Sequence, residues 1–293
     1  METLSGLNLE EIQKITSSLG ATNFRARQIH NWIYLKSVKE IDEMTDLSLK
    51  FREELKKVAK ITDVKIKVKQ VSSDGTIKYL LEFPDGECVE TVLMRFDNRA
   101  NLTACVSSQV GCAVNCSFCA TGKRGFIRNL TYKEIIEQVL TIQRDTDLKV
   151  TNVVFMGQGE PLLNLDNVLK AMEIFNENFQ IGARRLTVST SGIIPQIKKL
   201  AELDMQSTLA LSLHAPNHEI RKKIMPIENK YNIDKQFYLL YIFRCILNLE
   251  IFINNCCNIF DLSNSYSFIK LKNGNSFSVT RTISQTQNII AFF

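Results

Sequence analysis

The stretch Cys112-Ala-Val-Asn-Cys116-Ser-Phe-Cys119 places three thiols inside eight residues. A thiolate at each position can hold one iron of a cubane 4Fe–4S cluster, for which a complete set of protein ligands has four members. Three ligands leave one iron open to another molecule. A structural zinc site needs four closed ligands, and only Cys105 lies near enough in the sequence to be a local fourth. The motif therefore favours an iron–sulfur cluster with one open iron.

The composition around this motif is that of an ordinary globular protein. The chain has 293 residues, 45% hydrophobic and 23% charged, which is enough for one large domain with a smaller one. No apolar run reaches the roughly 18 residues that span a bilayer, and the N-terminus lacks the apolar core of a signal peptide. The acidic residues Glu2, Glu10 and Glu11 also argue against a transit peptide.

The cysteines and the net charge limit the compartment and the partners. Eight cysteines that cluster without a secretory signal favour a reducing compartment, here the cytoplasm, and metal ligation in place of disulfides. The formal charge of +5 is compatible with a polyanionic partner but does not require one. We therefore expect a cytoplasmic, monomeric protein with no membrane partner.

The N-terminal 1–60 have apolar positions at helical spacing. This pattern predicts a helical module with helices at 9–19, 24–34 and 48–60. Arg25, Arg27 and Lys36 are compatible with a surface that faces RNA. A solvated helix face explains the same charges and is preferred on the sequence alone.

Residues 61–100 switch to a period of two. This predicts three antiparallel strands at 65–70, 76–83 and 87–96, separated by turns. Glu90 lies within the last of them, among apolar residues. Two interpretations are compatible with that position. Glu90 is either a carboxylate that faces solvent or a functional carboxylate that its apolar setting helps to accept a proton.

From residue 101 to 235, apolar strands alternate with helices. Strands are expected at 103–110, 150–156, 185–190 and 207–213, with helices at 133–143, 164–179 and 195–203 between them. The alternation predicts an α/β fold with a parallel sheet, open or barrel-like. Polar motifs follow the strands: the cysteine loop, 157–161, 189–192 and 212–214. Because sites in such folds gather at the carboxyl ends of the strands, we expect these motifs to converge.

The composition changes at about Gln236. Residues 236–293 hold six charged side chains, one glycine and no proline, and show no clean period. We interpret this tail as sequence foreign to the preceding fold, from a retained intron, a frameshift or a degraded gene, and either disordered or mis-translated. Cys245, Cys256 and Cys257 lie in it and belong to no recognisable motif.

The segment Cys105-Val-Ser-Ser-Gln-Val-Gly-Cys-Ala-Val-Asn-Cys-Ser-Phe-Cys-Ala-Thr-Gly-Lys-Arg-Gly-Phe126 resembles the radical S-adenosylmethionine (SAM) enzymes. Within that superfamily it is similar to the RlmN/Cfr methyltransferases, and more to RlmN. The resemblance extends from the N-terminus to about residue 235. It implies an incomplete (β/α)6 partial TIM barrel after the helical module and the antiparallel strands. It also implies an enzyme that methylates C2 of adenosine in 23S rRNA and tRNA.

The resemblance assigns roles to individual residues. Cys112, Cys116 and Cys119 match the ligands of the 4Fe–4S cluster. Glu90 matches a glutamate that accepts the C2 proton, and Cys105 a cysteine that resolves an enzyme–RNA link by forming a disulfide. The residues that match SAM contacts are Phe118, Gly159, Glu160, Ser189, Ser212, Leu213 and His214. Alone, a phenylalanine is more often a core residue, a histidine near a strand end is usually just hydrogen-bonded, and the Gly157–Pro161 turn is no dinucleotide fingerprint.

The resemblance also implies partners and a gap. The partners are 23S rRNA, tRNA and an electron donor such as flavodoxin or ferredoxin. Basic residues near the expected site offer charge for RNA: Lys123, Arg124, Arg128, Arg184, Arg185, Arg221, Lys222 and Lys223. The family's methyl-carrying cysteine has no counterpart in this sequence, and about four of six strand–helix units are present. We therefore expect an unpaired sheet edge and a chain that is inactive in methyl transfer.

Two other functions remain compatible with the cysteines. One is a different radical SAM reaction, such as methylthiolation or peptide maturation. The other is a non-catalytic iron–sulfur or zinc module, which would be indifferent to SAM. Adding SAM to the reduced cluster and recording its EPR spectrum separates the module from the enzymes, and identifying the modified base separates the enzymes from one another.

Overall fold

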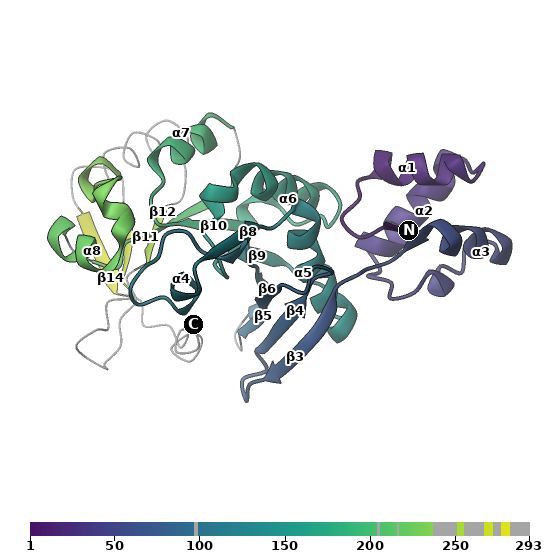
Figure 1. The fold of residues 1–293 in the computed structure, drawn as a ribbon, viewed down its shortest axis with the longest axis horizontal. Helices are drawn as coiled ribbons and strands as arrows, with labels where there is room; N and C mark the ends of the chain where they lie inside the picture. Colours follow the sequence, from purple (N-terminus) through teal and green to yellow (C-terminus); the bar gives the residue numbers. More distant parts are fainter. Residues whose placement is uncertain are drawn as a thin grey trace. The chain divides into compact units, whose positions relative to one another are not determined.

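The computed structural model describes residues 1–96, 99–203, 206–215 and 217–236, together with three strands at 251–254, 267–271 and 277–281 (Figure 1). The chain divides into two compact units. The first contains Met1–Ser107, Leu130–Val153 and Asp166–Gly182, and the second contains Ser108–Asn129, Val154–Leu165 and Ala183–Phe293. In the described parts of the chain, no helix combines the length and the apolar character needed to cross a membrane.

Three helices form the N-terminal part of the first unit, drawn in purple to blue in Figure 1: α1 (Leu9–Ser18), α2 (Asn23–Tyr34) and α3 (Leu49–Val58). Asn8 and Glu11 cap α1 reciprocally, so two backbone amides at its start are satisfied. The third helix ends at Val58, two residues before the predicted end. Ala59–Lys60 instead form β2, which pairs in parallel with β1 (Glu2–Thr3).

The long helix α5 (Tyr132–Thr146) anchors this N-terminal segment within the first unit. Its buried Arg144 forms an ion pair with the buried Glu137 of the same helix. The guanidinium also donates to the Ser5 hydroxyl over 2.5 Å and to the carbonyl of Val38 over 3.2 Å. The paired charges and these acceptors offset the desolvation of both side chains.

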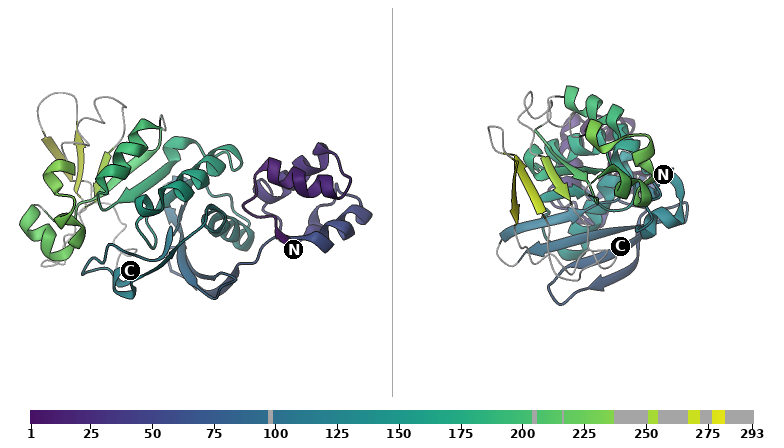
Figure 2. Two further views of the ribbon diagram at one scale, coloured as in Figure 1. Left: turned by 45° about the horizontal axis from the view of Figure 1, so that its top comes forward. Right: turned by 90° about the vertical axis from the view of Figure 1, so that its left-hand side faces the viewer.

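The three predicted antiparallel strands are present in the first unit as β3 (Lys65–Val71), β4 (Ile77–Glu82) and β5 (Cys88–Phe96). A fourth strand, β6 (Arg99–Cys105), pairs in antiparallel fashion with β5, so that the four lie side by side (Figure 2). The expected single strand at 103–110 is wrong in detail. β6 ends at Cys105, and a separate strand β7 (Gln109–Gly111) follows in the second unit, where it pairs with β8 (Phe126–Asn129). This hairpin encloses the cysteine loop.

Parallel strands and helices alternate in the second unit, as predicted. β10 (Leu186–Thr190) and β11 (Thr208–Ser212) pair in register from Thr187 with Thr208 to Thr190 with Leu211. The described helices of this unit are α4 (Ala120–Arg124), α7 (Ile194–Glu202) and α8 (His218–Ile224), with 3-10 turns η2 (Pro161–Asn164), η3 (Ala183–Arg185) and η4 (Pro226–Asn229). β9 (Asn152–Phe155) and α6 (Leu165–Glu177) pass from one unit to the other along the chain.

The predicted sheet edge does not lie on β11, because a further strand pairs with it and is itself the outermost described strand of the sheet. β12 (Ile251–Asn254) runs parallel to β11, with Leu209 opposite Ile251 and Ser212 opposite Asn254. Two further strands, β13 (Ser267–Leu271) and β14 (Phe277–Arg281), pair with each other in antiparallel fashion. One short stretch of the tail, β12, therefore supplies the backbone partner of β11.

Candidate functional site

The cysteine loop is held by backbone contacts within the second unit. The amide of Cys112 donates to the carbonyl of Gly125 over 3.0 Å, which closes the loop at the base of the β7–β8 hairpin. The amide of Cys119 donates to the carbonyl of Cys116 over 3.1 Å, and Cys119 caps α4. In the middle of the loop, the amide of Ser117 donates to the carbonyl of Ile224 at the end of α8 over 2.9 Å. Backbone hydrogen bonds therefore fix the loop close to each of the three thiols.

The three thiols are half-buried and influence one another electrostatically. Burial raises the pKa of Cys112 to about 11 and that of Cys116 to about 12, and the neighbouring cysteines add to both increases. Because a bound cation favours the thiolate, a site of this kind gains by holding a metal. Among the described residues no three His, Cys, Asp or Glu side chains converge on one ion. A cubane binds each cysteine through a different iron, so its donors need not meet at one point. The donor set fits a 4Fe–4S cluster.

The turn after β9 packs directly against β7. Gly159 has φ +98°, and a Cβ placed there would lie 2.5 Å from the Cβ of Gln109, so only glycine fits. The Gln109 side chain accepts from the amide of Glu160 over 2.9 Å and donates to the Asn129 side chain over 2.8 Å. Gln109 thus fixes the turn to the hairpin that carries the cysteines. This residue was not predicted from the sequence, although it stands next to the motif.

Glu160 lies in the turn after β9 and contacts the residue that follows β10. It is buried, and its carboxylate accepts from the amide of Ser191 over 2.7 Å, from the Ser191 hydroxyl over 2.8 Å and from the amide of Leu162 over 3.1 Å. Burial raises the pKa of this carboxyl group, and the hydrogen bonds oppose the rise. Glu160 therefore joins the turn after β9 to the end of β10. Ser191 was part of the predicted 189–192 motif but was not singled out.

The remaining predicted SAM contacts come together in the same unit. The hydroxyls of Ser189 on β10 and Ser212 on β11 are 3.0 Å apart. The rings of Phe118 in the cysteine loop and His214 after β11 lie 4.7 Å apart at 50°. Leu213, between Ser212 and His214, is buried. The predicted convergence of the motifs at the carboxyl ends of the strands is therefore present within this unit.

Glu90 and Cys105 lie in the first unit, on neighbouring strands of one ladder. Val92 and Cys105 are opposite each other in the β5–β6 register, so Glu90 is two residues along from the partner of Cys105. The Glu90 carboxylate pairs with the Lys78 ammonium over 2.9 Å and is only half-buried, so its setting is less apolar than its strand sequence suggests. Cys105 is buried. The structure brings these two predicted residues together.

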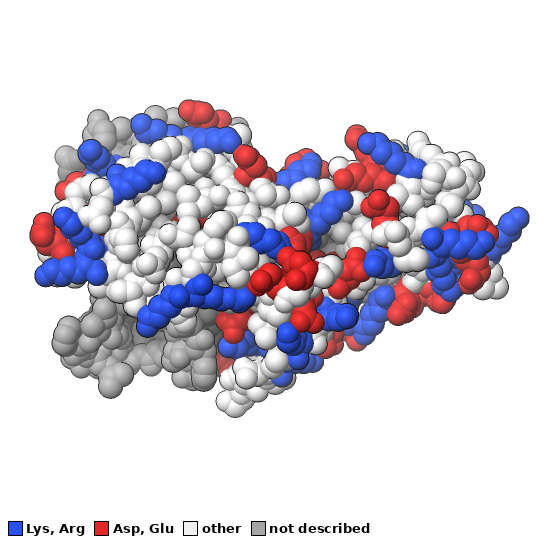
Figure 3. Space-filling model, in the orientation of Figure 1, with Lys and Arg blue, Asp and Glu red and all other residues white. Residues whose placement is uncertain are grey.

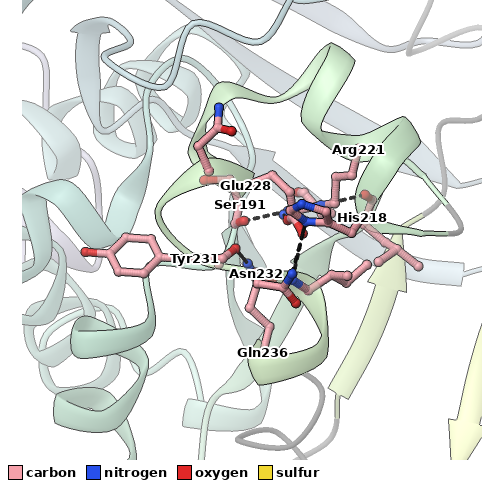
Figure 4. A network of polar contacts seen from close by, with 12 residues as sticks. Ser191, His218, Arg221, Glu228, Tyr231, Asn232 and Gln236 are labelled. Atoms are coloured by element: carbon pink, nitrogen blue, oxygen red, sulfur yellow. Dashed lines mark hydrogen bonds and ion pairs between the residues drawn. The ribbon is translucent and has the colours of Figure 1, made fainter.

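The predicted basic surface is partly wrong. Figure 3 shows basic side chains gathered over α8 and over α4 with β8 in the second unit, and α4 and α8 carry Lys123, Arg124, Lys222 and Lys223 in their last turns. Arg221, which we had grouped with them, is fully buried and does not face solvent. Its partner is the buried Glu228, in the polar network of Figure 4. Sequence spacing gave no signal for that pairing.

His214 provides a pH test of this pocket. Burial, with a smaller contribution from the charge of Arg221, lowers the pKa of His214 to about 4, whereas an unfolded histidine titrates near 6.5. Below pH 6.5 the unfolded chain takes up a proton that the folded chain does not. The buried, neutral His214 therefore leaves the free energy of unfolding of the cluster-free protein unchanged well above pH 6.5 and lowers it as the pH drops from 6.5 towards 4. Between pH 7 and 4.5 this decrease should amount to about 2–3 kcal/mol, and we expect His214→Gln to abolish it.

Urea unfolding at several pH values measures this difference. Part of the slope should survive in the variant, because burial also lowers the pKa of His30 in the N-terminal helices. Equal pH slopes for the variant and the parent chain would show that His214 is not held neutral by its surroundings.

Comparison with known proteins gives family matches over most of the chain. The model of the Radical SAM superfamily matches residues 106–235, and that of the Ribosomal RNA large subunit methyltransferase N-terminal domain matches residues 3–61. The probable dual-specificity RNA methyltransferase RlmN of Alkaliphilus oremlandii is 47% identical over 235 residues, covering 79% of this chain and 68% of the relative. The dual-specificity RNA methyltransferase RlmN of Nitratiruptor sp. is 47% identical over 250 residues, covering 80% and 69%.

A solved structure extends the likeness to the fold. The radical SAM methyltransferase from Sphaerobacter thermophilus superposes with a TM-score of 0.80 at 37% sequence identity, covering 87% of this chain and 76% of that one. The agreement confirms the predicted α/β class and the partial barrel of the radical SAM fold.

Proposed function

Because this chain belongs to the RlmN family of radical SAM RNA methyltransferases, we propose that its fold serves methyl transfer to C2 of adenosine in 23S rRNA and tRNA, and that the 293 residues alone do not complete this reaction. The observation that carries the proposal is the convergence in one unit of the three-cysteine loop with Glu160, Ser189 and His214. Members of this superfamily use a 4Fe–4S cluster and SAM. When bound, these cofactors supply one-electron cleavage of the sulfonium bond, which activates an otherwise inert C–H bond.

The side chains of this chain divide the work of binding. Cys112, Cys116 and Cys119 would hold the cluster. The Phe118 ring, which contacts the ring of His214, would pack on the adenine of SAM, because an aromatic face excludes water and accepts a stacked ring. Other contacts orient the ligand: the backbone of Gly159, the carboxylate of Glu160, Ser189, Ser212 and Leu213.

Two residues of the first unit handle protons and sulfur in the proposed reaction. Glu90 accepts the C2 proton of adenosine, and the nearby Lys78 ammonium stabilises the carboxylate before the transfer. Cys105 would resolve the enzyme–RNA link by forming a disulfide with the methyl-carrying cysteine: the new S–S bond replaces the bond from that sulfur to the RNA-linked carbon, which takes up a proton. That second cysteine would come from the C-terminal part of a relative. The position of Glu90 and Cys105 on adjacent strands of the same ladder supports a shared task. The charges over α4, α8 and β8 and the N-terminal module of residues 1–60 supply contacts to RNA phosphates.

We also retain as proposals a cytoplasmic location, a monomeric state and a flavodoxin- or ferredoxin-type reductant. A reducing compartment would keep the cysteines available for the cluster. The sequence-based division into 1–60, 61–100, 101–235 and 236–293 remains part of the proposal. The methyl-carrying cysteine has no motif-matched counterpart among Cys245, Cys256 and Cys257, which lie outside the described residues. We therefore expect the 293-residue polypeptide alone to bind SAM without completing methyl transfer.

A two-step experiment tests this function. The first step adds SAM to the reconstituted, reduced chain, and we expect the EPR spectrum of the cluster to change. An unchanged spectrum would favour the non-catalytic module. The second step joins residues 1–235 to the C-terminal part of the Alkaliphilus oremlandii relative and supplies ribosomal RNA and tRNA. We expect 2-methyladenosine from this chimera and none from the 293-residue chain. A methylthiolated base or a modified peptide would instead point to another radical SAM reaction.

A further inference from the structure

Arg221 is a fully buried arginine, and each of its three guanidinium nitrogens donates a hydrogen bond. Its Nη1 pairs with the Glu228 carboxylate, which is also fully buried. Its Nε donates to the carbonyl of Leu213 over 3.0 Å. Its Nη2 donates to the carbonyls of Ser191 over 2.6 Å and Ser212 over 3.2 Å. Figure 4 shows Arg221 and Glu228 pointing toward each other inside this network.

The three carbonyls belong to two different strand ends. Ser191 follows β10, whereas Ser212 ends β11 and Leu213 comes next. The same short segments carry Ser189, Ser212 and His214, which face the proposed SAM site. One side chain therefore ties together the two strand ends that offer most of the predicted contacts to SAM.

The helix that carries Arg221 also reaches the cysteine loop. Ile224, at the end of α8, accepts from the amide of Ser117 between the second and third cysteines. The Glu228 partner is fixed in turn, because its other carboxylate oxygen lies 2.8 Å from the amide of Ile233 and 2.8 Å from Nδ1 of His218. The segment from α8 to η4 thus contacts the cysteine loop, β10 and β11 at once.

The chemistry of the site requires an arginine. A buried charge is unfavourable unless it is paired and hydrogen-bonded, and here the carboxylate and the three carbonyls meet both needs. The planar guanidinium presents donors in several fixed directions, whereas a lysine ammonium is a compact charge on a flexible stem. Lysine would preserve the charge but could not reach all four acceptors.

We propose that Arg221, held by Glu228, is a positioning residue that sets the ends of β10 and β11 in the arrangement that binds SAM. This inference rests on the proposed SAM-dependent function. A positioning residue affects the SAM site specifically, whereas a residue that only stabilises the fold lowers the free energy of unfolding without a specific effect on that site. A general contribution would also be expected of a second buried pair among the described residues, Arg144 with Glu137 on α5, which lies in the first unit and whose hydrogen bonds described above reach none of the predicted SAM-binding residues.

The first measurement is amide hydrogen exchange on the 293-residue chain without SAM. We expect Arg221→Lys to speed exchange in the peptide that contains Ser191 and Gly192 by about tenfold or more, because the strand end loses its anchor. The matched control Arg144→Lys should speed exchange in α5 and leave the Ser191 peptide unchanged. Unchanged exchange at Ser191 in Arg221→Lys would overturn the positioning role, whatever the chain binds.

The second measurement is SAM affinity of the cluster-reconstituted proteins. We expect Arg221→Lys to weaken SAM binding by about tenfold, which corresponds to about 1.4 kcal/mol, at an unchanged iron content. Glu228→Gln keeps the size of the partner and should give a smaller loss, which covers the case in which Arg221→Lys does not fold. Arg144→Lys should bind SAM as the parent does.

The outcomes separate the two proposals. Faster exchange at Ser191 with unchanged SAM affinity would overturn the positioning role and leave the proposed function standing. A parent chain that holds its cluster and does not bind SAM would overturn the proposed function and this inference with it. An equal loss of SAM affinity in Arg144→Lys would show that the effect comes from stability alone.

Discussion

Cys116→Ser should leave the chain without a stable 4Fe–4S cluster and without a response to SAM. The serine hydroxyl keeps nearly the same shape but is a far poorer iron ligand than a thiolate. With only Cys112 and Cys119 remaining in the loop, half of the cubane would lack a protein ligand. We expect the iron content after reconstitution to fall from about four atoms per chain to near background. Cys112→Ser and Cys119→Ser should behave in the same way.

Cys88→Ser is the matched control for this prediction. Cys88 is also half-exposed, but it lies at the start of β5 and outside the loop, so its replacement should leave the iron and sulfide content unchanged. Circular dichroism of the cluster-free proteins checks that each variant is folded. A full cluster in Cys116→Ser, with the spectrum of the parent, would contradict the assignment of the three ligands.

Features that depend on nearby residues were predictable from the sequence. The three thiols lie on one loop because their spacing places them there. The polar motifs converge because each follows a parallel strand, and parallel strands end at the same edge. The 157–161 and 189–192 motifs were placed in this way, whereas Glu160 and Ser189 were singled out by the resemblance to the family. The structure joins the Glu160 turn to the end of β10 through Ser191. Local order and strand direction were sufficient for that part of the site.

Features that depend on distant partners were not predictable. Arg221 stands in a run with Lys222 and Lys223, and such a run normally marks a solvated face. Its burial follows from Glu228, seven residues later, and from carbonyls about ten and thirty residues earlier. Gln109 was overlooked for a similar reason, because its partners Asn129 and Glu160 are brought to it only by the fold.

The tail shows the limit of composition as a guide to pairing. The scarcity of charge, glycine and proline in residues 236–293 indicated that this segment differs from the rest. Composition carries no information about which backbone groups meet, so the pairing of β12 with β11 was not anticipated. A strand edge needs only an extended backbone beside it, and short β-branched or aromatic stretches such as Ile251–Asn254 supply one.

Among Gly→Ala substitutions at the glycines that the structure describes, Gly111→Ala should destabilise the cysteine loop most. Gly111 has φ +75°, and a Cβ placed there would lie 1.8 Å from the carbonyl oxygen of Gly125, a backbone atom that cannot rotate away. That carbonyl is the acceptor for the amide of Cys112, so relieving the clash would move the first thiol ligand. Left-handed strain and overpacking together predict a loss of roughly 2–5 kcal/mol in the free energy of unfolding.

Gly20→Ala separates the clash from the strain. Gly20 has a similar φ of +71° after α1, and an added methyl group would have no atom within 4 Å, so only the left-handed conformation is penalised. We expect this control to lose about 1–2 kcal/mol and to keep its cluster, since the cysteine loop is untouched. Urea midpoints and iron content measure both variants. The prediction would be contradicted if both variants lost the same free energy of unfolding and Gly111→Ala kept its full iron content. In that case the Gly125 carbonyl moves without disturbing Cys112, and the hairpin does not position the cluster ligands.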